Sequence, residues 1–421
     1  QRQMCIRDSI PNNEFTRDEI LSMLAKEMLD AAELLPASQS EVGRIHKYIA
    51  LAYAAKIKLY QAYQQDETTH AVTSINKELL REVVSLCDQV TASNRYGLLD
   101  DFQGLDLVAN ENGKESVFAI QYSMNDGTES AGRINWSNLL NSPGGGSPYG
   151  GDGFFLPSQD LINAYQTDAN GLPDFNYQSK SDYSWAVLNN GVYTLQNTTP
   201  NVDPRLDFVV GRPTITWKTY PDKPCEGWVR DKETYGYNCA KRFWVSPESS
   251  DMFNGWPWGA SQLNWQIIRY ADILLWKAEA LIELNEGNGL ETARDLINQI
   301  RNRARNSAYV KDFNDHSNYA ANYLVNPYPA DVWNQDYARQ ALRWETRLEK
   351  ALEGERFFDL VRWGIVETTM NKYIAAESDN RIYYANAHFT GGKDEYYPVP
   401  NNQYGFSGGK YVQNPGYAPF N

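Results

Sequence analysis

The chain has 421 residues, of which 42% are hydrophobic and 13% aromatic, so it can bury a large core in one domain or in two or three. Its formal net charge of −14 leaves no electrostatic case for binding DNA, RNA or an anionic lipid surface, and we interpret it as a source of solubility. No apolar run is as long as the roughly 18–20 residues that a membrane-spanning helix requires.

The N-terminal part predicts helices after a short leader. Residues 1–14, which begin QRQMCIRDS, follow neither a helical nor a strand period, and we interpret them as a non-native or disordered leader. Apolar residues then recur at helical spacing over 15–35, 42–62 and 77–92. Cys87 lies on the apolar face of the third helix, where we expect a buried thiol.

The middle of the chain predicts loops with a few short strands. A strand is expected near 117–122. Residues 142–153 (SPGGGSPYGGDG) form a Gly-rich loop, which lacks the Gly-Lys-Ser/Thr ending of a phosphate-binding loop. Residues 154–265 contain strand-like pieces between long loops, and long loops in a compact domain often carry the function.

Tryptophan is concentrated in this loop-rich region, where seven of the 12 tryptophans lie between residues 183 and 265. Flat aromatic faces stack on the apolar C–H faces of sugar rings, while neighbouring polar groups hydrogen-bond the hydroxyls. The alternative is that the rings pack together and hold a region without regular structure. The candidate ligand-binding residues are Trp185, Trp217, Tyr220, Trp228, Trp256 and Trp258.

The sharpest of these candidates is the tripeptide Trp256-Pro257-Trp258. Proline fixes its own φ, so the two rings would lose little freedom when a ligand binds. The alternative is that both rings pack at the base of the helix that we expect to begin near residue 263.

The strongest helical pattern lies in the last third of the chain. Apolar residues recur at helical spacing over 263–284, stop at the Asn- and Gly-containing segment 285–289, and resume over 290–305. Two helices joined by a short polar turn form an αα-hairpin of tetratricopeptide type. Further helices are predicted over 337–353 and 357–363, followed by an irregular tail over 383–421.

Charged residues near the end of this helical region predict ion pairs. Glu353, Glu355 and Asp359 could suggest acid–base chemistry, but four arginines interleave with them at helical spacing. Pairing between packed helices is the better interpretation. The arginines are Arg343, Arg347, Arg356 and Arg362.

No other motif predicts an enzyme, a cofactor or a metal centre. The sequence GFSGG at 405–409 lacks the flanking strand and helix that a nucleophile elbow needs, and the four histidines are scattered. Two minor hypotheses stay open. The turn 168–174 (DANGLPD) would hold calcium only with an incomplete ligand set, and Cys225 and Cys239 would close a disulfide loop in an oxidising compartment.

Several longer motifs occur in one order along the chain. They begin with VGRIHKYIALAYAAKIKLY at residue 42 and include ESVFAIQYS, GDGFFLP and DPRL. RYADILLWKAEAL at residue 269 and LEKALEGERFFDLVRWG at residue 348 follow, and YYPVPNNQ and QNPGY lie near the end. Together these segments resemble the SusD/RagB family, the outer-membrane substrate-binding lipoproteins of the Bacteroidetes.

The resemblance implies a mostly α fold, a tetratricopeptide-like superhelix with long irregular loops and a few short strands. Residues 15–421 would form one SusD-like domain, with a helical part (15–135), a loop-rich aromatic insertion (136–265) and a C-terminal helical part with its tail (266–421). It also implies that an N-terminal part with a secretion signal and a lipidated cysteine precedes this chain, and that Cys5 is not that cysteine.

The resemblance further implies a non-catalytic, lipid-anchored protein at the cell surface of the outer membrane. It would bind an oligosaccharide and deliver it to a SusC-like TonB-dependent transporter, with no nucleic acid among its partners. Ligand residues in the family follow no motif that can be mapped onto this chain. Two alternatives stay open: a RagB-like lid for peptides, and an all-helical glycoside hydrolase with two carboxylates roughly 5–9.5 Å apart across a cleft.

Overall fold

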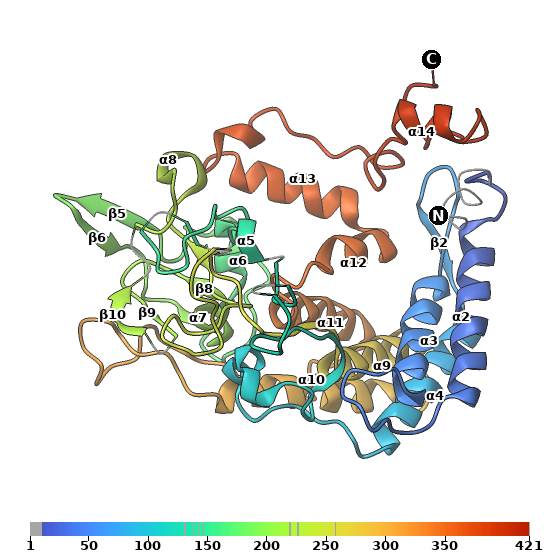
Figure 1. Cartoon of the computed structure of the whole chain (residues 1–421), viewed down its shortest axis with the longest axis horizontal. Helices are drawn as coiled ribbons and strands as arrows, with labels where there is room; N and C mark the ends of the chain where they lie inside the picture. Colours follow the sequence, from blue (N-terminus) through green and yellow to red (C-terminus); the bar gives the residue numbers. More distant parts are fainter. Residues whose placement is uncertain are drawn as a thin grey trace.

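The computed structural model describes residues 11–420 except 130, 131, 137, 142, 145, 219, 225, 226 and 257. This part of the chain is mostly helical, with long irregular segments and six small sheets of two strands each, which confirms the expected fold class (Figure 1). Within it, no helix combines the length and apolar character that crossing a bilayer requires. Most of the expected leader lies outside the described residues.

The N-terminal helices lie close to their predicted positions: α2 (Arg17–Leu34), α3 (Lys47–Ala62) and α4 (Lys77–Ala92). Thr16 and Glu19 form a capping box that begins α2, because each side chain hydrogen-bonds the other residue's backbone N–H. A hairpin of β1 (Tyr63–Gln65) and β2 (Val72–Ile75), which the sequence pattern did not predict, joins α3 to α4.

The C-terminal helices include the predicted αα-hairpin of α9 (Tyr270–Leu284) and α10 (Gly289–Asn306), in which Asn285 adopts the left-handed conformation that ends α9. Next come α11 (Gln335–Glu349) and α12 (Arg356–Arg362). The predicted extension of α11 to residue 353 is wrong, because the chain turns at Leu352 and Gly354 with φ of 67° and 84°. The unpredicted α13 (Val366–Glu377) follows.

The predicted start of α9 at residue 263 is also wrong. Trp265–Arg269 is strand β12, and it pairs antiparallel with β3 (Ser116–Ile120), which confirms the strand expected near 117–122. The carboxylate of Asp272 accepts the backbone N–H of Arg269, so α9 begins only after Arg269.

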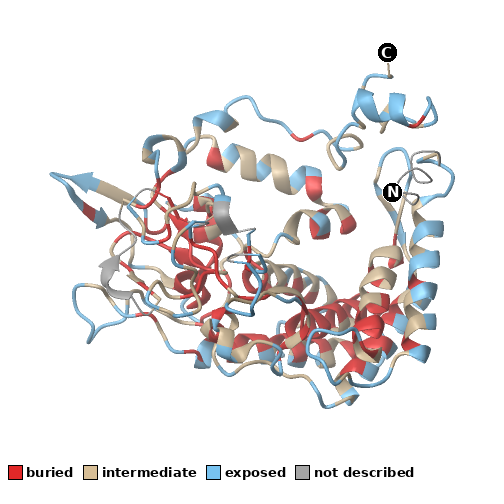
Figure 2. Cartoon of the chain, viewed as in Figure 1, coloured by how far each residue is buried: buried red, intermediate tan, exposed pale blue. Residues whose placement is uncertain are grey.

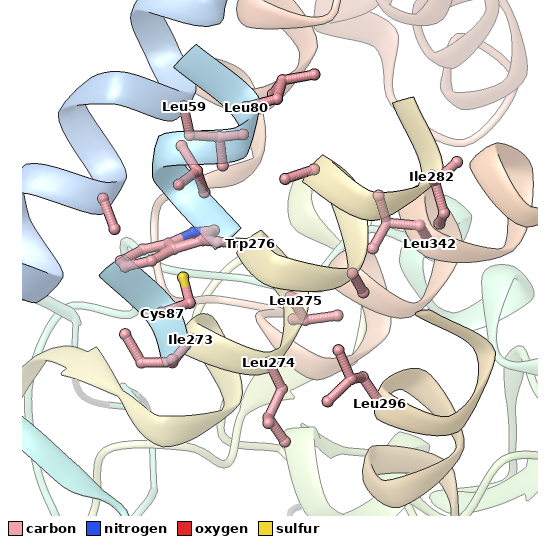
Figure 3. Close-up of a cluster of buried hydrophobic side chains, with 14 of the residues drawn as sticks. Leu59, Leu80, Cys87, Ile273, Leu274, Leu275, Trp276, Ile282, Leu296 and Leu342 are labelled. Carbon is pink, nitrogen blue, oxygen red and sulfur yellow. The ribbon is translucent and has the colours of Figure 1, made fainter. Parts of the chain in front are cut away.

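One hydrophobic core joins the N-terminal and C-terminal helices. Figure 3 shows Cys87 of α4 close to Trp276 and Ile273 of α9, and the thiol is buried as predicted. Burial raises the pKa of Cys87 to about 12. Small residues such as Ala278 and Ala293 let the helices approach closely. Figure 2 shows this core in red, while α14 (Asn401–Phe406) and the tail beside it are mostly exposed.

Buried arginines connect the helices to the rest of the molecule. Arg269 pairs with Glu115, Glu349 and Glu353, and Arg303 pairs with Glu115 and Glu349. The prediction of ion pairs is therefore right, but most partners come from other elements than expected. Glu355 pairs with Lys56, Arg347 pairs with Asp160, and Arg362 pairs with Glu279. Arg362 also forms the expected pair with Asp359.

Arg343 and Arg356 differ from Arg347 and Arg362, because no carboxylate of the described residues lies within ion-pair distance of either. The expected ion pair of Arg343 is therefore not found in this part of the chain, and Nη1 of Arg356 donates to the carbonyl of Arg343. Burial is the main reason why the pKa of Arg356 falls to about 9. The expected ion pair of this residue is thus not found in the described structure.

The remaining short elements build a loop-rich lobe on the far side of α9–α11 from α2 (Figure 1). The strand pairs are β4 (Gln166–Thr167) with β7 (Asn201–Val202), β5 (Ala186–Asn189) with β6 (Val192–Leu195), β8 (Val210–Gly211) with β11 (Cys239–Ala240), and β9 (Thr216–Trp217) with β10 (Tyr220–Pro224). The helices are α5 (Asn138–Asn141), α6 (Gln159–Ala164), α7 (Arg205–Val209) and α8 (Lys232–Tyr235).

Candidate functional site

Two of the predicted ligand-binding tryptophans lie inside the loop-rich lobe. Trp217 is 1% exposed and Trp228 is 4% exposed, and their ring centroids are 4.8 Å apart. Tyr149 and Trp244 complete the cluster, and the indole N–H of Trp217 donates to the Tyr149 hydroxyl at 2.8 Å. For Trp217 and Trp228 the expected solvent-facing role is therefore wrong, because rings enclosed by other rings present no face to a ligand.

The Trp256–Trp258 segment is exposed instead. A β-bridge between Met252 and Ser261 closes a hairpin loop, which we call the Trp hairpin (252–261). Trp256 is 62% exposed, Trp258 is 50% exposed, and Trp256 meets the ring of Trp136 edge to face at 5.2 Å. The alternative that both rings are buried at the base of a helix is thus contradicted. Pro257 lies outside the described residues.

The other two candidates are less informative. Trp185, which directly precedes β5, is exposed. Tyr220 lies in β10, whose side chains fall outside the described part of the structure. A ligand-binding role for Trp185, Tyr220, Trp256 and Trp258 stays a prediction.

A pocket of about 480 Å³ lies where α8, the C-terminal end of α13 and the segment 152–158 meet. We call it the Tyr pocket. Figure 1 shows α8 beside the end of α13, and α13 brings Tyr373 and Glu377 to this place. Sequence reasoning missed the pocket because its residues come from three separate segments and because α13 was not predicted.

Aromatic rings form one wall of the Tyr pocket. The ring centroids of Tyr235 and Tyr383 are 6.1 Å apart, and those of Tyr383 and Tyr384 are 4.6 Å apart. Tyr235, Tyr383 and the neighbouring Phe154 are exposed. The hydroxyls of Tyr373 and Tyr384 lie 3.1 Å from each other, which fixes the inner pair of rings. Exposed faces held by packed neighbours suit stacking on a flat apolar ligand surface.

A buried carboxyl group lies at the bottom of the pocket. Glu377 is 1% exposed, and its Oε1 accepts the backbone N–H of Asp160 at the start of α6. Its Oε2 has no hydrogen-bond partner among the described residues. Burial, with a smaller contribution from the Asp160 charge, raises the pKa of Glu377 to about 7. Near neutral pH this group can therefore donate or accept a hydrogen bond.

The segment that lines the pocket also contacts the Trp hairpin. Arg230 holds it through an ion pair with Asp152 at 2.9 Å and a hydrogen bond to the carbonyl of Gly151 at 3.0 Å. Gly150 has φ of 70°, and a Cβ there would come within 2.8 Å of the Cβ of Trp258. One glycine-rich stretch thus connects the exposed tryptophans with the Tyr pocket.

The Tyr pocket holds further carboxylates besides Glu377. Of its described carboxylates, Asp152 is ion-paired, and Asp231 caps α8 by accepting the backbone N–H of Thr234. No group of three or more possible metal ligands occurs among the residues that the structure describes. In the turn 168–174, which was suggested for calcium, the Asp168 carboxylate accepts the backbone N–H groups of Asn170 and Leu172.

Two other cavities are larger than the Tyr pocket. A cavity of about 610 Å³ has a mostly polar lining that includes Asp106, whose carboxylate pairs with Lys218 and Arg242. Another of about 810 Å³ is lined by rings such as Phe358 and Tyr397 together with charged residues. Cys239 is buried, and Cys225, its expected disulfide partner, lies outside the described residues.

Comparison with known proteins shows which family and fold this architecture resembles. The family model described as "SusD family" matches residues 114–417. A SusD superfamily protein from Bacteroides vulgatus is 21% identical with a TM-score of 0.62, over 93% of this chain and 67% of that chain. Surface glycan-binding protein A from Bacteroides fluxus is 20% identical with a TM-score of 0.61, over 95% and 70%.

A third similar structure is that of a laminarin binding SusD-like protein, with 20% identity and a TM-score of 0.51, over 95% of this chain and 69% of that one. A search among curated proteins gave no match. At these identities the solved structures show a shared fold. The family match extends over the third β-strand, the loop-rich lobe and the C-terminal helices, and the chain therefore belongs to the SusD family.

Proposed function

We propose that this protein is a non-catalytic glycan-binding protein of the cell surface, and that it holds an oligosaccharide in the Tyr pocket. The observation that carries the proposal is the pocket itself, in which exposed tyrosine faces stand beside a buried carboxyl group, one oxygen of which has no partner among the described residues. Two structures of similar fold are named for binding laminarin and surface glycans, which supports a carbohydrate ligand.

In this proposal the faces of Tyr235 and Tyr383 stack on a sugar ring, and Glu377 hydrogen-bonds a hydroxyl group. The exposed Trp256 and Trp258 would extend the binding face to further sugar units, because the glycine-rich segment contacts both the Trp hairpin and the pocket. Trp185 and Tyr220 remain candidates for the same face. Stacking on a ring face does not depend on one particular sugar, so such a site fits several saccharides.

Membership of the SusD family supports two further parts of the proposal. The protein would be lipid-anchored at the outer membrane, and it would deliver its ligand to a SusC-like TonB-dependent transporter. Neither role requires covalent chemistry. The large helical core would then serve as a rigid body that carries the loop-rich lobe.

The test is calorimetric titration of the protein with a panel of purified oligosaccharides, alongside Tyr235→Ala and Tyr383→Ala. Each change should weaken binding by about 1–2 kcal/mol, roughly 5–30-fold, because a stacking face is removed. Tyr397→Ala is the matched control, because Tyr397 is a highly exposed tyrosine that lines a different cavity. Its affinity should equal that of the parent protein.

The same panel separates the alternatives. Binding of peptides in place of every saccharide would favour a RagB-like lid. Release of reducing ends that stops in Glu377→Gln would favour a glycoside hydrolase and would overturn the proposal of binding without turnover.

A further inference from the structure

The charges around the Tyr pocket are not all neutralised by one another. Asp152 is paired with Arg230, and Asp231 is used as the cap of α8. Glu377 accepts the backbone N–H of Asp160, and its pKa of about 7, which follows mainly from burial, leaves it partly uncharged near neutral pH. The carboxyl groups of the pocket therefore contribute little free negative charge.

Arg381 is compensated less fully, because it lowers the pKa of Glu377 in part but forms no ion pair with a described carboxylate. It lines the pocket just after α13, and no carboxylate of the described residues lies within 4.0 Å of its guanidinium group. Its Nη1 donates to the carbonyl of Asn380 at 2.7 Å, and no other hydrogen bond of the group is found in that part of the chain. Most of its N–H groups are thus available to a ligand.

Packing holds this guanidinium in place. A Cβ on Gly236 would lie 2.1 Å from Nη2 of Arg381, so the group rests directly against the backbone that ends α8. Gly236 has φ of 78°, a conformation that few other residues adopt readily. A guanidinium fixed in this way loses little freedom when it binds a partner.

We propose that the Tyr pocket selects an acidic saccharide, in which the carboxylate of a uronic acid unit binds Arg381 while the sugar ring lies against Tyr383 and Tyr235. The inference rests on the proposed function and names the class of ligand for the same pocket. The planar fork of arginine matches the two oxygens of a carboxylate, whereas a neutral sugar offers hydroxyls that gain less from a full positive charge. Glu377 at the bottom of the pocket then faces the hydroxyl groups of the ring.

The experiment compares matched ligands. Oligosaccharides of polygalacturonate, alginate and glucuronoxylan are titrated beside their carboxyl-reduced neutral forms, and a set of neutral glucans is included. At least one acidic oligosaccharide should bind at least 10-fold more tightly than its reduced form. This preference should shrink as salt is raised, because the charges are partly exposed.

Variants of Arg381 test whether this residue causes the preference for the acidic oligosaccharide. Arg381→Gln should remove the preference for the acidic form, and Arg381→Lys should restore only part of it, because lysine keeps the charge but lacks the fork. Arg305→Gln, at an exposed arginine on α10, is the control and should keep the preference. Thermal melting of each variant confirms that folding is intact.

The outcomes separate the two proposals. If neutral and acidic forms bind alike, or only neutral glucans bind, and Tyr383→Ala weakens that binding, the acidic ligand is wrong and glycan binding stands. If Arg381→Gln keeps the full preference, the charge is recognised elsewhere and the inference fails. If no saccharide binds, the proposed function fails as well.

Discussion

One cluster of the loop-rich lobe is built from different side chains than the helical core. In α3, α4, α9 and α10, alanine, leucine and isoleucine recur at helical spacing, and each fills a small part of the core. In the lobe, one cluster mixes rings with aliphatic residues such as Val209 and Ile215, whereas Tyr149, Trp217, Trp228 and Trp244 form a second cluster dominated by rings. Around this second cluster the irregular backbone presents side chains without a period, so a few large rings fill the space that many small residues fill between helices. Dense tryptophan in such a region indicates core packing first.

The largest expected effect, and the most direct test of this comparison, comes from Trp217→Ala. Loss of the ring and of its hydrogen bond to Tyr149 should lower the free energy of unfolding by about 3–5 kcal/mol in a urea titration. Trp256→Ala, at an exposed ring, should change it by no more than about 0.5 kcal/mol. Equal stability of the two variants would show that the lobe does not depend on its buried rings.

A smaller effect is expected from two buried carboxyl groups, Glu349 at the end of α11 among paired arginines and Glu377 at the end of α13 beside the lobe. Arginines are the main reason why the pKa of Glu349 falls to about 2, against the effect of burial, whereas burial raises that of Glu377 to about 7. A carboxyl group whose folded pKa is raised favours the fold below its unfolded pKa near 4.5, and that contribution is lost as pH rises through 7.

Glu377→Gln should therefore stabilise the protein relative to the parent at pH 8, by about 1–3 kcal/mol, and by much less at pH 5. Chemical denaturation at both pH values measures the difference. A constant difference between pH 5 and pH 8 would contradict the assigned pKa.

The smallest effect concerns a single helix end. The Asn76 side chain accepts the N–H groups of Glu78 and Leu79 at the start of α4, so Asn76→Ala should cost about 1 kcal/mol of stability. Asn76→Ser, which can still accept, should recover most of it in the same urea titration. A loss as large as that of Trp217→Ala would contradict the view that the helical part spreads its stability over many small contributions.

The sequence predicted those elements whose evidence is local. Helices α4 and α10 have a clear apolar period, and polar capping residues mark the start of α2 and of α4. Strand β12 was assigned to a helix because an apolar run of this length fits either structure, and only its pairing with β3 decides between them. Helix α13 was missed because it buries only Val366 and Glu377 among its residues, which gives too weak a pattern.

The site was less predictable than the fold. Aromatic composition alone could not distinguish the buried Trp217 from the exposed Trp256, because the loops around them have no period from which burial follows. The Tyr pocket depends on contacts between α8, α13 and the segment 152–158, which are far apart in the chain. The adjacent Tyr383 and Tyr384 were the one local indication, and they were grouped with an irregular tail.

The long-range ion pairs have a consequence for how the chain reaches its native state. Lys56 pairs with Glu355, 299 residues away, and Glu115 pairs with Arg303, 188 residues away. Lys56 of α3 thus leaves the ribosome long before Glu355 exists, although other charges of α2–α4 pair locally, as Lys58 does with Glu82. Because closing such distant contacts slows folding, we expect the pairs of Lys56 and Glu115 to form late in folding.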